Sequence, residues 1–146
     1  MHEVNSPLRE VAPSLEQIGP HVTLERLYDG RIGVLTVTSI DRQSIDLWSE
    51  TAIRLLSERA PDQPHLVVHD VSGEGLALTS YIRKKAQETV GHYPDAPGRT
   101  AIVVRRGAAA ILMQLFVNNL VRVISGRPTR IFFNRDEALD WLKERF

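Results

Sequence analysis

The stretch Arg130-Ile-Phe-Phe-Asn134-Arg-Asp-Glu137-Ala-Leu-Asp-Trp141-Leu142 decides the fold class of this chain. After the arginine, its first residues are β-branched or aromatic, as in a short buried strand. Asn134 is a good N-cap, and Glu137 three residues later completes a capping box. Apolar residues recur on one side of the helix that follows, so we expect Trp141 to be largely buried against a sheet. This order predicts one unit of an α/β protein.

The same unit recurs upstream along the chain. Residues 66–68 and 101–104 are apolar runs of the kind that form buried parallel strands, and the first strand is expected to run on to Asp70. Helical periodicity follows Asp41, and further helices are expected over about residues 78–90 and 108–125.

The chain opens with a hairpin signal. Asp29-Gly30 separates two extended runs, residues 21–28 and 31–38. The resulting order, β-β-α-β-α-β-α-β-α, predicts an α/β fold. We expect a single mixed, mainly parallel sheet of about five strands, with an opening β-hairpin and about four helices.

The domain organisation is expected to be simple. Residues 1–20 contain several proline and glycine breakers and are expected to form a partly ordered N-terminal tail, with a short helical turn at residues 14–18. Residues 21–146 are expected to form one domain, since 146 residues is an ordinary size for a single core.

Composition excludes several classes of function. Eighteen basic residues balance eighteen acidic ones, so no net charge would attract nucleic acid. The chain has no cysteine, and therefore no thiolate nucleophile and no cysteine zinc site. The first residues lack the pattern of a signal peptide, and no apolar run is free enough of polar residues to span a membrane. We therefore expect a cytoplasmic protein without a cofactor.

From about residue 23 to residue 146, the expected order resembles the STAS domain of the bacterial anti-sigma factor antagonists, the SpoIIAA-like fold. It is more similar still to small uncharacterised bacterial proteins grouped with that fold as STAS/SEC14-like. The resemblance rests on residues 66–73, Leu-Val-Val-His-Asp-Val-Ser-Gly, and on residues 131–142. It implies a non-enzymatic regulatory or interaction module and, on the SEC14 side, a binder of a small apolar or lipid-like ligand.

The resemblance also implies a phosphorylation site. Anti-sigma factor antagonists carry an Asp-Ser-Ser-Gly-Leu-like run in which a serine is phosphorylated, and residues 78–82 match it here. Ser80 and Thr79 are therefore candidate phospho-acceptors, although Leu78 replaces the acid and Tyr81 replaces the glycine. The alternative, which cap preference favours, is that one of the two hydroxyls only caps the helix.

A candidate anion pocket lies where the parallel strands end, because open α/β sheets bind ligands at that edge. The polar side chains expected there are Asp70, Ser72, Arg105, Arg106 and Asn134. The favoured alternative is that Asp70 and Arg105 form an ion pair between neighbouring strands.

Two histidines on one strand invite a comparison with metal sites. His65 and His69 are four residues apart, which is about 13 Å along a strand and too far for one ion. We therefore expect no metal site, and we expect His69 to be a hydrogen-bonded, partly buried side chain.

The helix at residues 108–125 has more apolar surface than one sheet face can cover. A neighbouring helix, a ligand or another subunit must cover the excess. We expect a homodimer or a protein partner here. The side chains expected to form a dimer interface, on the flank away from the sheet, are Met113, Phe116, Val117, Asn119 and Leu120.

Three hypotheses for function follow. The first is a non-enzymatic interaction or regulatory module, acting as a homodimer or with a protein partner. The second is a binder of a small apolar ligand, and the third, least supported because no nucleophile–base set is visible, is an enzyme. A cavity beneath the helix at residues 108–125 would favour the second hypothesis, and a flat symmetric contact would favour the first.

Overall fold

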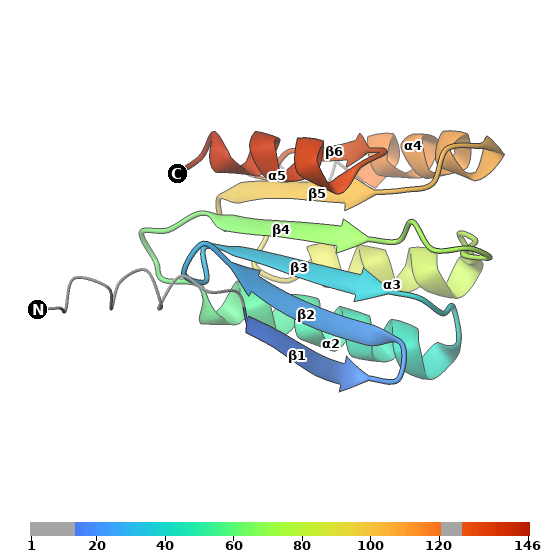
Figure 1. The fold of residues 1–146 in the computed structure, drawn as a ribbon, viewed down its shortest axis with the longest axis horizontal. Coiled ribbons are helices and arrows are strands. Elements are labelled where there is room, and N and C mark those ends of the chain that lie inside the picture. Colours follow the sequence, from blue (N-terminus) through green and yellow to red (C-terminus); the bar gives the residue numbers. More distant parts are fainter. Residues whose placement is uncertain (1–13, 121–126) are drawn as a thin grey trace, which may run out of the picture.

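The computed structural model describes residues 14–120 and 127–146, and it has the expected α/β architecture built on one mixed sheet. The elements are β1 (Ser14–Gly19), β2 (Val22–Leu27), β3 (Ile32–Val37), α2 (Arg42–Glu58), β4 (His65–Asp70), α3 (Ser80–Val90), β5 (Gly98–Val103), α4 (Ala108–Leu120), β6 (Thr129–Phe132) and α5 (Arg135–Lys143) (Figure 1). The expected extension of α4 to residue 125 lies outside the described residues from position 121 on.

The six strands lie side by side in sequence order. The β1–β2 and β2–β3 pairs are antiparallel, and the pairs from β3 to β6 are parallel. Because each parallel crossover steps in the same direction and crossovers share one hand, α2, α3 and α4 must lie on the same face. The ribbon shows this arrangement, with α5 alone on the opposite face (Figure 1).

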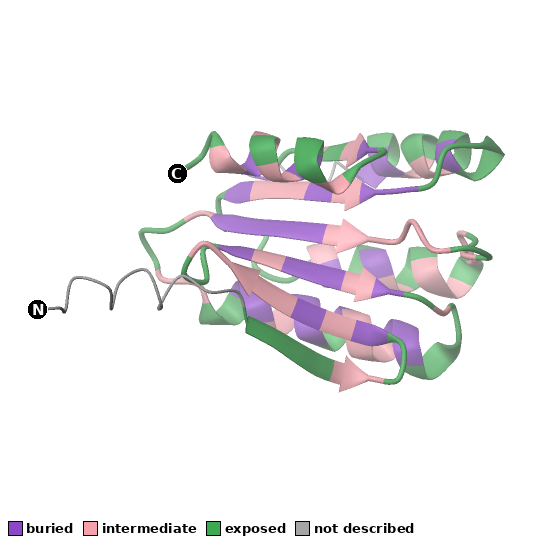
Figure 2. Cartoon of the chain, viewed as in Figure 1, coloured by how far each residue is buried: buried purple, intermediate pink, exposed green. Residues whose placement is uncertain are grey.

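Each sheet face has its own core, because alternate strand residues point to opposite sides. The buried residues are concentrated in the central strands and on the helix sides that meet the sheet (Figure 2). Beneath α5 lie Ile32, Val34, Leu66, Val68, Ala101, Val103 and Phe132, packed on Ala138 and Leu142. Beneath α2 lie Val22, Leu24, Leu35 and Val67, packed on Ala52 and Leu55. The strand β4 is therefore buried on both faces, as its apolar run predicts.

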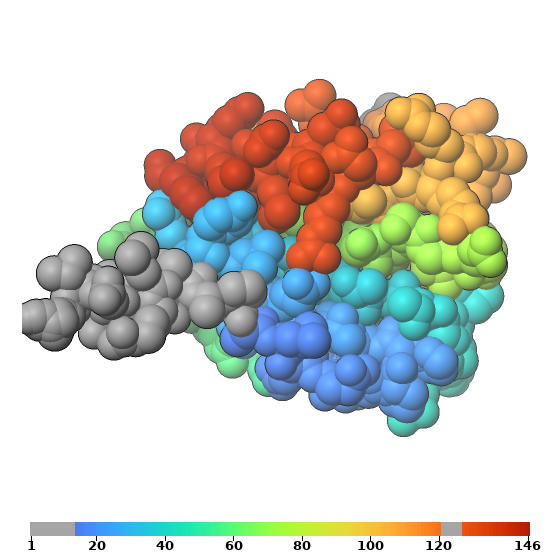
Figure 3. Space-filling model, viewed as in Figure 1, coloured from blue at the N-terminus to red at the C-terminus, as the bar shows by residue number. Residues whose placement is uncertain are grey.

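The closing helix α5 covers only part of its face. The view from its side shows α5 over the β4–β6 half, while side chains of β1 and β2 lie open beside it (Figure 3). One ion pair, Arg135 to Glu25 at 2.8 Å, links α5 to the open half.

The opening hairpin has the expected turn. Asp29 and Gly30 both have positive φ, 59° and 81°, and the Arg31 N–H donates to the Tyr28 carbonyl at 3.2 Å. Positive φ at both central residues is the geometry that an Asp-Gly hairpin favours.

The expected helical turn at residues 14–18 was wrong, and the tail was placed too far along the chain. Residues 14–19 form β1, which pairs with β2 from Ser14 opposite Arg26 onward. The strand escaped detection because it is an edge strand with mostly exposed side chains, so its sequence carries no alternation of apolar and polar residues. The sheet consequently has six strands rather than about five.

The closing unit is less buried than its pattern predicts. Asn134 Oδ1 accepts from the Glu137 N–H at 2.8 Å, as an N-cap should. Trp141, however, is only half-buried, and it packs on Phe132 at 5.6 Å between ring centroids. Phe133 follows the strand and is 40% exposed. Burial was overestimated because α5 lies at the edge of the sheet, above its last strands.

Candidate ligand cavity between α3 and α4

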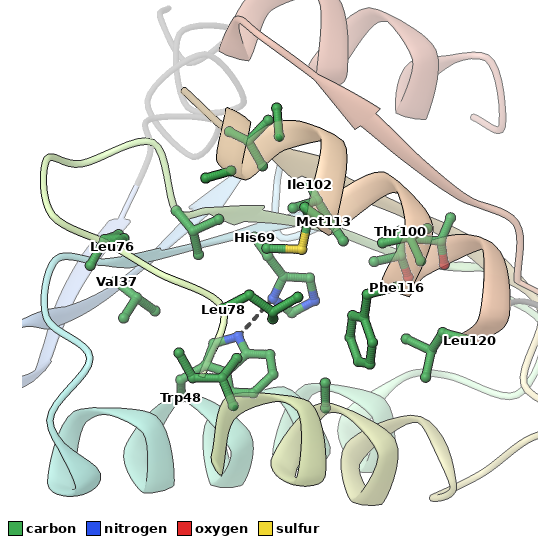
Figure 4. Close-up of a pocket in the computed structure, with 18 of the residues that line it drawn as sticks. Val37, Trp48, His69, Leu76, Leu78, Thr100, Ile102, Met113, Phe116 and Leu120 are labelled. Atoms are coloured by element: carbon green, nitrogen blue, oxygen red, sulfur yellow. Dashed lines mark hydrogen bonds between the residues drawn. The ribbon is translucent and has the colours of Figure 1, made fainter. Parts of the chain in front are cut away.

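A cavity of about 360 Å³ lies on the face of the sheet that carries three helices. Its floor is formed by β4 and β5, one wall by α2 and α3, and the other by α4 (Figure 4). Trp48 and Leu78 approach from one side, and Met113, Phe116 and Leu120 from the other. The lining is mainly aliphatic and aromatic, so the cavity suits an apolar molecule.

Strand alternation determines which side chains reach the floor. His65 and His69 share a face of β4 with Val67, while Leu66 and Val68 belong to the core beneath α5. From β5, Thr100 and Ile102 complete the floor. The four-residue spacing of the histidines therefore places both of them along one cavity, without bringing them together at one point.

A hydrogen bond orients His69. The Trp48 Nε1–H donates to His69 Nδ1 at 2.9 Å, so the neutral imidazole carries its proton on Nε2. Burial lowers the pKa of His69 from 6.5 to about 4, so the ring is neutral near pH 7. The expectation of a partly buried, hydrogen-bonded His69 is confirmed.

The Nε2 atom of His69 makes no hydrogen bond within residues 14–120 and 127–146. In the close-up, the ring stands between Trp48 and Phe116, inside the cavity (Figure 4). His69 thus offers an N–H donor to a floor with mainly apolar surroundings, a combination that can orient a bound molecule.

The end of the cavity near the start of β4 is lined by buried polar groups. His65 is 8% exposed, and burial, followed by the charges of Arg127, His69 and Arg59, lowers its pKa to about 3. Arg127 is itself 3% exposed and donates to the Tyr93 and Ala96 carbonyls at 2.7 and 3.0 Å. These bonds satisfy a buried guanidinium and tie the chain before β5 to the chain before β6.

The opposite end carries Arg105 and Arg106, but the five residues of the expected anion pocket do not converge. Asp70 Oδ1 accepts from the Ser72 N–H at 3.1 Å and from its hydroxyl at 2.6 Å. Asn134 caps α5 on the other face of the sheet. Arg105 and Arg106 line the cavity, whereas Asp70, Ser72 and Asn134 do not. The structure thus connects Asp70, Ser72 and Arg105 through hydrogen bonds but does not gather all five residues in one pocket.

The expected Asp70–Arg105 ion pair was also wrong. Arg105 instead approaches Glu74 at 3.4 Å, and its Nε donates to the Ser72 carbonyl at 3.3 Å. Alternation explains the difference, because Asp70 follows Leu66 and Val68 toward the α5 face while Arg105 lines the cavity on the opposite face.

The two hydroxyl side chains at the start of α3, Thr79 and Ser80, differ in their contacts. Thr79 is the N-cap, and its Oγ1 accepts from the Ile82 N–H at 3.1 Å. Ser80 is the first helical residue and is exposed, within 3.3 Å of an Arg83 nitrogen. The capping alternative is confirmed for Thr79, and phosphorylation of either hydroxyl stays a prediction.

The expected orientation of α4 was wrong. Val117 and Leu120 are 1% and 8% exposed, and Met113 and Phe116 line the cavity, so these four point toward the sheet. Of the expected interface residues, only Asn119 is exposed. The side chains that point outward are Ile111, Leu112 and Leu115, which are 66%, 60% and 58% exposed. Because nearly the whole circumference of α4 is apolar, its sequence pattern could not reveal which side faces the sheet.

The described residues show no metal cluster and no membrane-spanning helix. In the part of the chain that the structure describes, no three histidine, aspartate or glutamate side chains are grouped to hold a metal ion. None of the helices described is long and apolar enough to cross a bilayer. No family model, curated protein or solved structure matches this chain. The resemblance to STAS domains therefore stays a hypothesis.

The sequence predicted that a neighbouring helix, a ligand or another subunit covers the excess apolar surface of α4. A ligand cavity was thus one of three alternatives. The Trp48–His69 hydrogen bond was missed, since the two residues are 21 positions apart. Their common face could have been read from helical and strand periodicity, but their contact depends on how α2 packs on β4.

Proposed function

We propose that this chain is a non-enzymatic binder of a small apolar ligand, held in the cavity between α3 and α4. The single observation that carries the proposal is the cavity itself, about 360 Å³ with mainly apolar walls. Pockets for small molecules commonly measure roughly 300–1,000 Å³. Water would make few hydrogen bonds in such a space, so an apolar ligand gains by displacing it.

The chemistry of the ligand follows from the floor. His69 offers one N–H, and its imidazole is neutral near pH 7 because its pKa is about 4. A neutral donor pairs well with a carbonyl, ether or hydroxyl oxygen and does not require a buried counter-charge. The proposed ligand is therefore an apolar molecule with one hydrogen-bond acceptor near its middle or end.

A fluorescent probe tests the proposal. Wild-type protein titrated into 1-aminoanthracene should give saturable, blue-shifted emission, because the probe would leave water for the cavity. Met113→Trp fills the cavity from α4 and should weaken binding by at least about tenfold, the effect of about 1.4 kcal/mol.

The matched control lies two residues away on the same helix. Leu115→Trp adds the same aromatic group to a side chain that is 58% exposed, and it should bind the probe as wild type does. If wild type and Met113→Trp bound 1-aminoanthracene with equal affinity, and circular dichroism showed both to be folded, the proposal would be refuted. Native mass spectrometry of the purified protein would then identify any small molecule that remains bound.

A second candidate function is self-association as an interaction module. Ile111, Leu112 and Leu115 form an exposed apolar strip along α4, and residues 108–120 include no charged side chain that would repel a second copy. A twofold contact of α4 with its own copy would cover this strip. Light scattering at tens of micromolar should then report a dimer that Leu112→Lys converts to monomer, and a wild-type monomer would exclude it.

A further inference from the structure

A second cavity, of about 310 Å³, lies at the opposite end of the sheet, where β3 and β4 begin. Its walls come from the β2–β3 turn, the end of α2, the start of β4 and the last residues of the chain. Four arginines from separate parts of the sequence line it: Arg26, Arg31, Arg59 and Arg145.

The charge of this arginine cavity is strongly positive. Glu58 is the one acidic residue that lines it, so four guanidinium groups and one carboxylate leave a surplus of three positive charges. The whole chain has a formal net charge of zero, so the surplus reflects local clustering and not a basic protein.

Arg31 and Arg59 are held in place without being neutralised. Arg31 lies over the Phe146 ring at 3.8 Å, and Arg59 Nη1 donates to the carbonyls of Ala60, Pro61 and Gln63. Within residues 14–120 and 127–146, neither of these two arginines nor Arg145 makes an ion pair.

The one carboxylate in the cavity binds weakly. Glu58 meets Arg26 at 3.4 Å, with both side chains well exposed, and such a pair contributes little. Guanidinium groups that are pre-positioned and not neutralised are what recognition of a phosphate group requires, since the planar fork can donate two hydrogen bonds to its oxygens.

We infer that the arginine cavity binds a phosphate-bearing anion with two or more negative charges. The inference is independent of the apolar cavity, since it rests on a different set of side chains. Its ligand could be free in solution or could be the headgroup of an amphiphile, because His65 lines both cavities.

Isothermal titration calorimetry with sodium pyrophosphate tests the inference. Wild type should show saturable one-site binding. Arg31→Gln combined with Arg145→Gln should weaken binding by at least about tenfold, through loss of charge-assisted hydrogen bonds. Arg83→Gln combined with Lys84→Gln removes the same charge from exposed positions on α3, outside the cavity, and should leave affinity within about twofold of wild type.

Two results would overturn the inference. One is the absence of saturable pyrophosphate binding at millimolar concentration. The other is equal weakening in both double variants, which would mean that net charge alone attracts the anion.

Dodecyl phosphate distinguishes the two sources of the phosphate group. If Met113→Trp weakens dodecyl phosphate binding and leaves pyrophosphate binding intact, the arginine cavity holds the headgroup of an amphiphile. If Met113→Trp changes neither affinity, it holds a free anion. Both results support the inference, and a failure of 1-aminoanthracene to bind would leave it unaffected.

Discussion

The two histidines of β4 should make the stability of the fold sensitive to mild acid. Burial lowers the pKa of His69 from 6.5 to about 4, and that of His65 to about 3. The unfolded chain therefore binds protons near pH 6.5, where both native rings remain neutral. As the pH falls below 6.5, protonation favours the unfolded state, so the free energy of unfolding falls until the native pKa values are reached.

The size of the effect follows from the pKa values. Between pH 7 and pH 5, each histidine should lower the free energy of unfolding by about 2 kcal/mol, at 1.36 kcal/mol per pKa unit. The wild type should thus lose about 4 kcal/mol over this range, a large share of the ~5–15 kcal/mol typical of a domain. Carboxyl groups change little over this range, because their ordinary pKa values lie near 4.

His69→Gln isolates one of the two contributions. Its side-chain oxygen can still accept from the Trp48 Nε1–H, but it cannot titrate. Urea denaturation at pH 7 and pH 5 should show a loss of about 2 kcal/mol for His69→Gln, against about 4 kcal/mol for wild type. His92→Gln removes an exposed histidine and should retain the wild-type loss. An unchanged pH dependence in His69→Gln would refute the assignment of a buried neutral imidazole.

Three further substitutions test the packing around the two cavities, each by urea denaturation. Gly98→Ala should destabilise by about 3 kcal/mol or more, since a Cβ there would lie 1.9 Å from the His65 carbonyl oxygen; a near-neutral result would contradict the close β4–β5 pairing. Thr79→Ala should cost about 1 kcal/mol by removing the cap on the Ile82 N–H, and no change would mean that the cap is dispensable. Arg127→Met should cost about 2 kcal/mol by leaving the buried Ala96 carbonyl and the part-buried Tyr93 carbonyl without a donor, and no loss would contradict this role.

Elements defined by local chemistry could be predicted from the sequence. Asp41 caps α2 through the Ser44 N–H, and Asn134 caps α5, as their positions before helical runs indicate. The turn at Asp29-Gly30 likewise needs only the two residues that form it. These signals lie within a few positions of each other, so tertiary packing does not alter them.

Features that depend on packing between distant elements could not be predicted in the same way. The edge strand β1 exists because β2 offers it a partner, and its own side chains are mostly exposed. The arginine cavity contains residues far apart in the sequence, among them Arg31, Arg59 and Arg145. Only the packing of the β2–β3 turn, the end of α2 and the C-terminal residues brings them together. From the sequence, charged residues were expected to cluster only at the carboxyl ends of the parallel strands. The arginine cavity lies at the other end of these strands and was therefore not predicted.

The helix α4 is where the two candidate functions separate. Leu112 and Met113 are adjacent residues of α4 with opposite environments. Leu112 is 60% exposed, whereas Met113 lines the apolar cavity. A helix that only covered the sheet would need one apolar side, whereas α4 has a second one on its outer surface. Ligand binding requires the inner side chains, and self-association requires the outer ones. Met113→Trp should therefore change probe affinity without changing the oligomeric state, and Leu112→Lys should do the reverse. If either substitution altered both properties together, the cavity and the outer strip would be parts of one coupled site, and the division of α4 into two independent faces would be wrong.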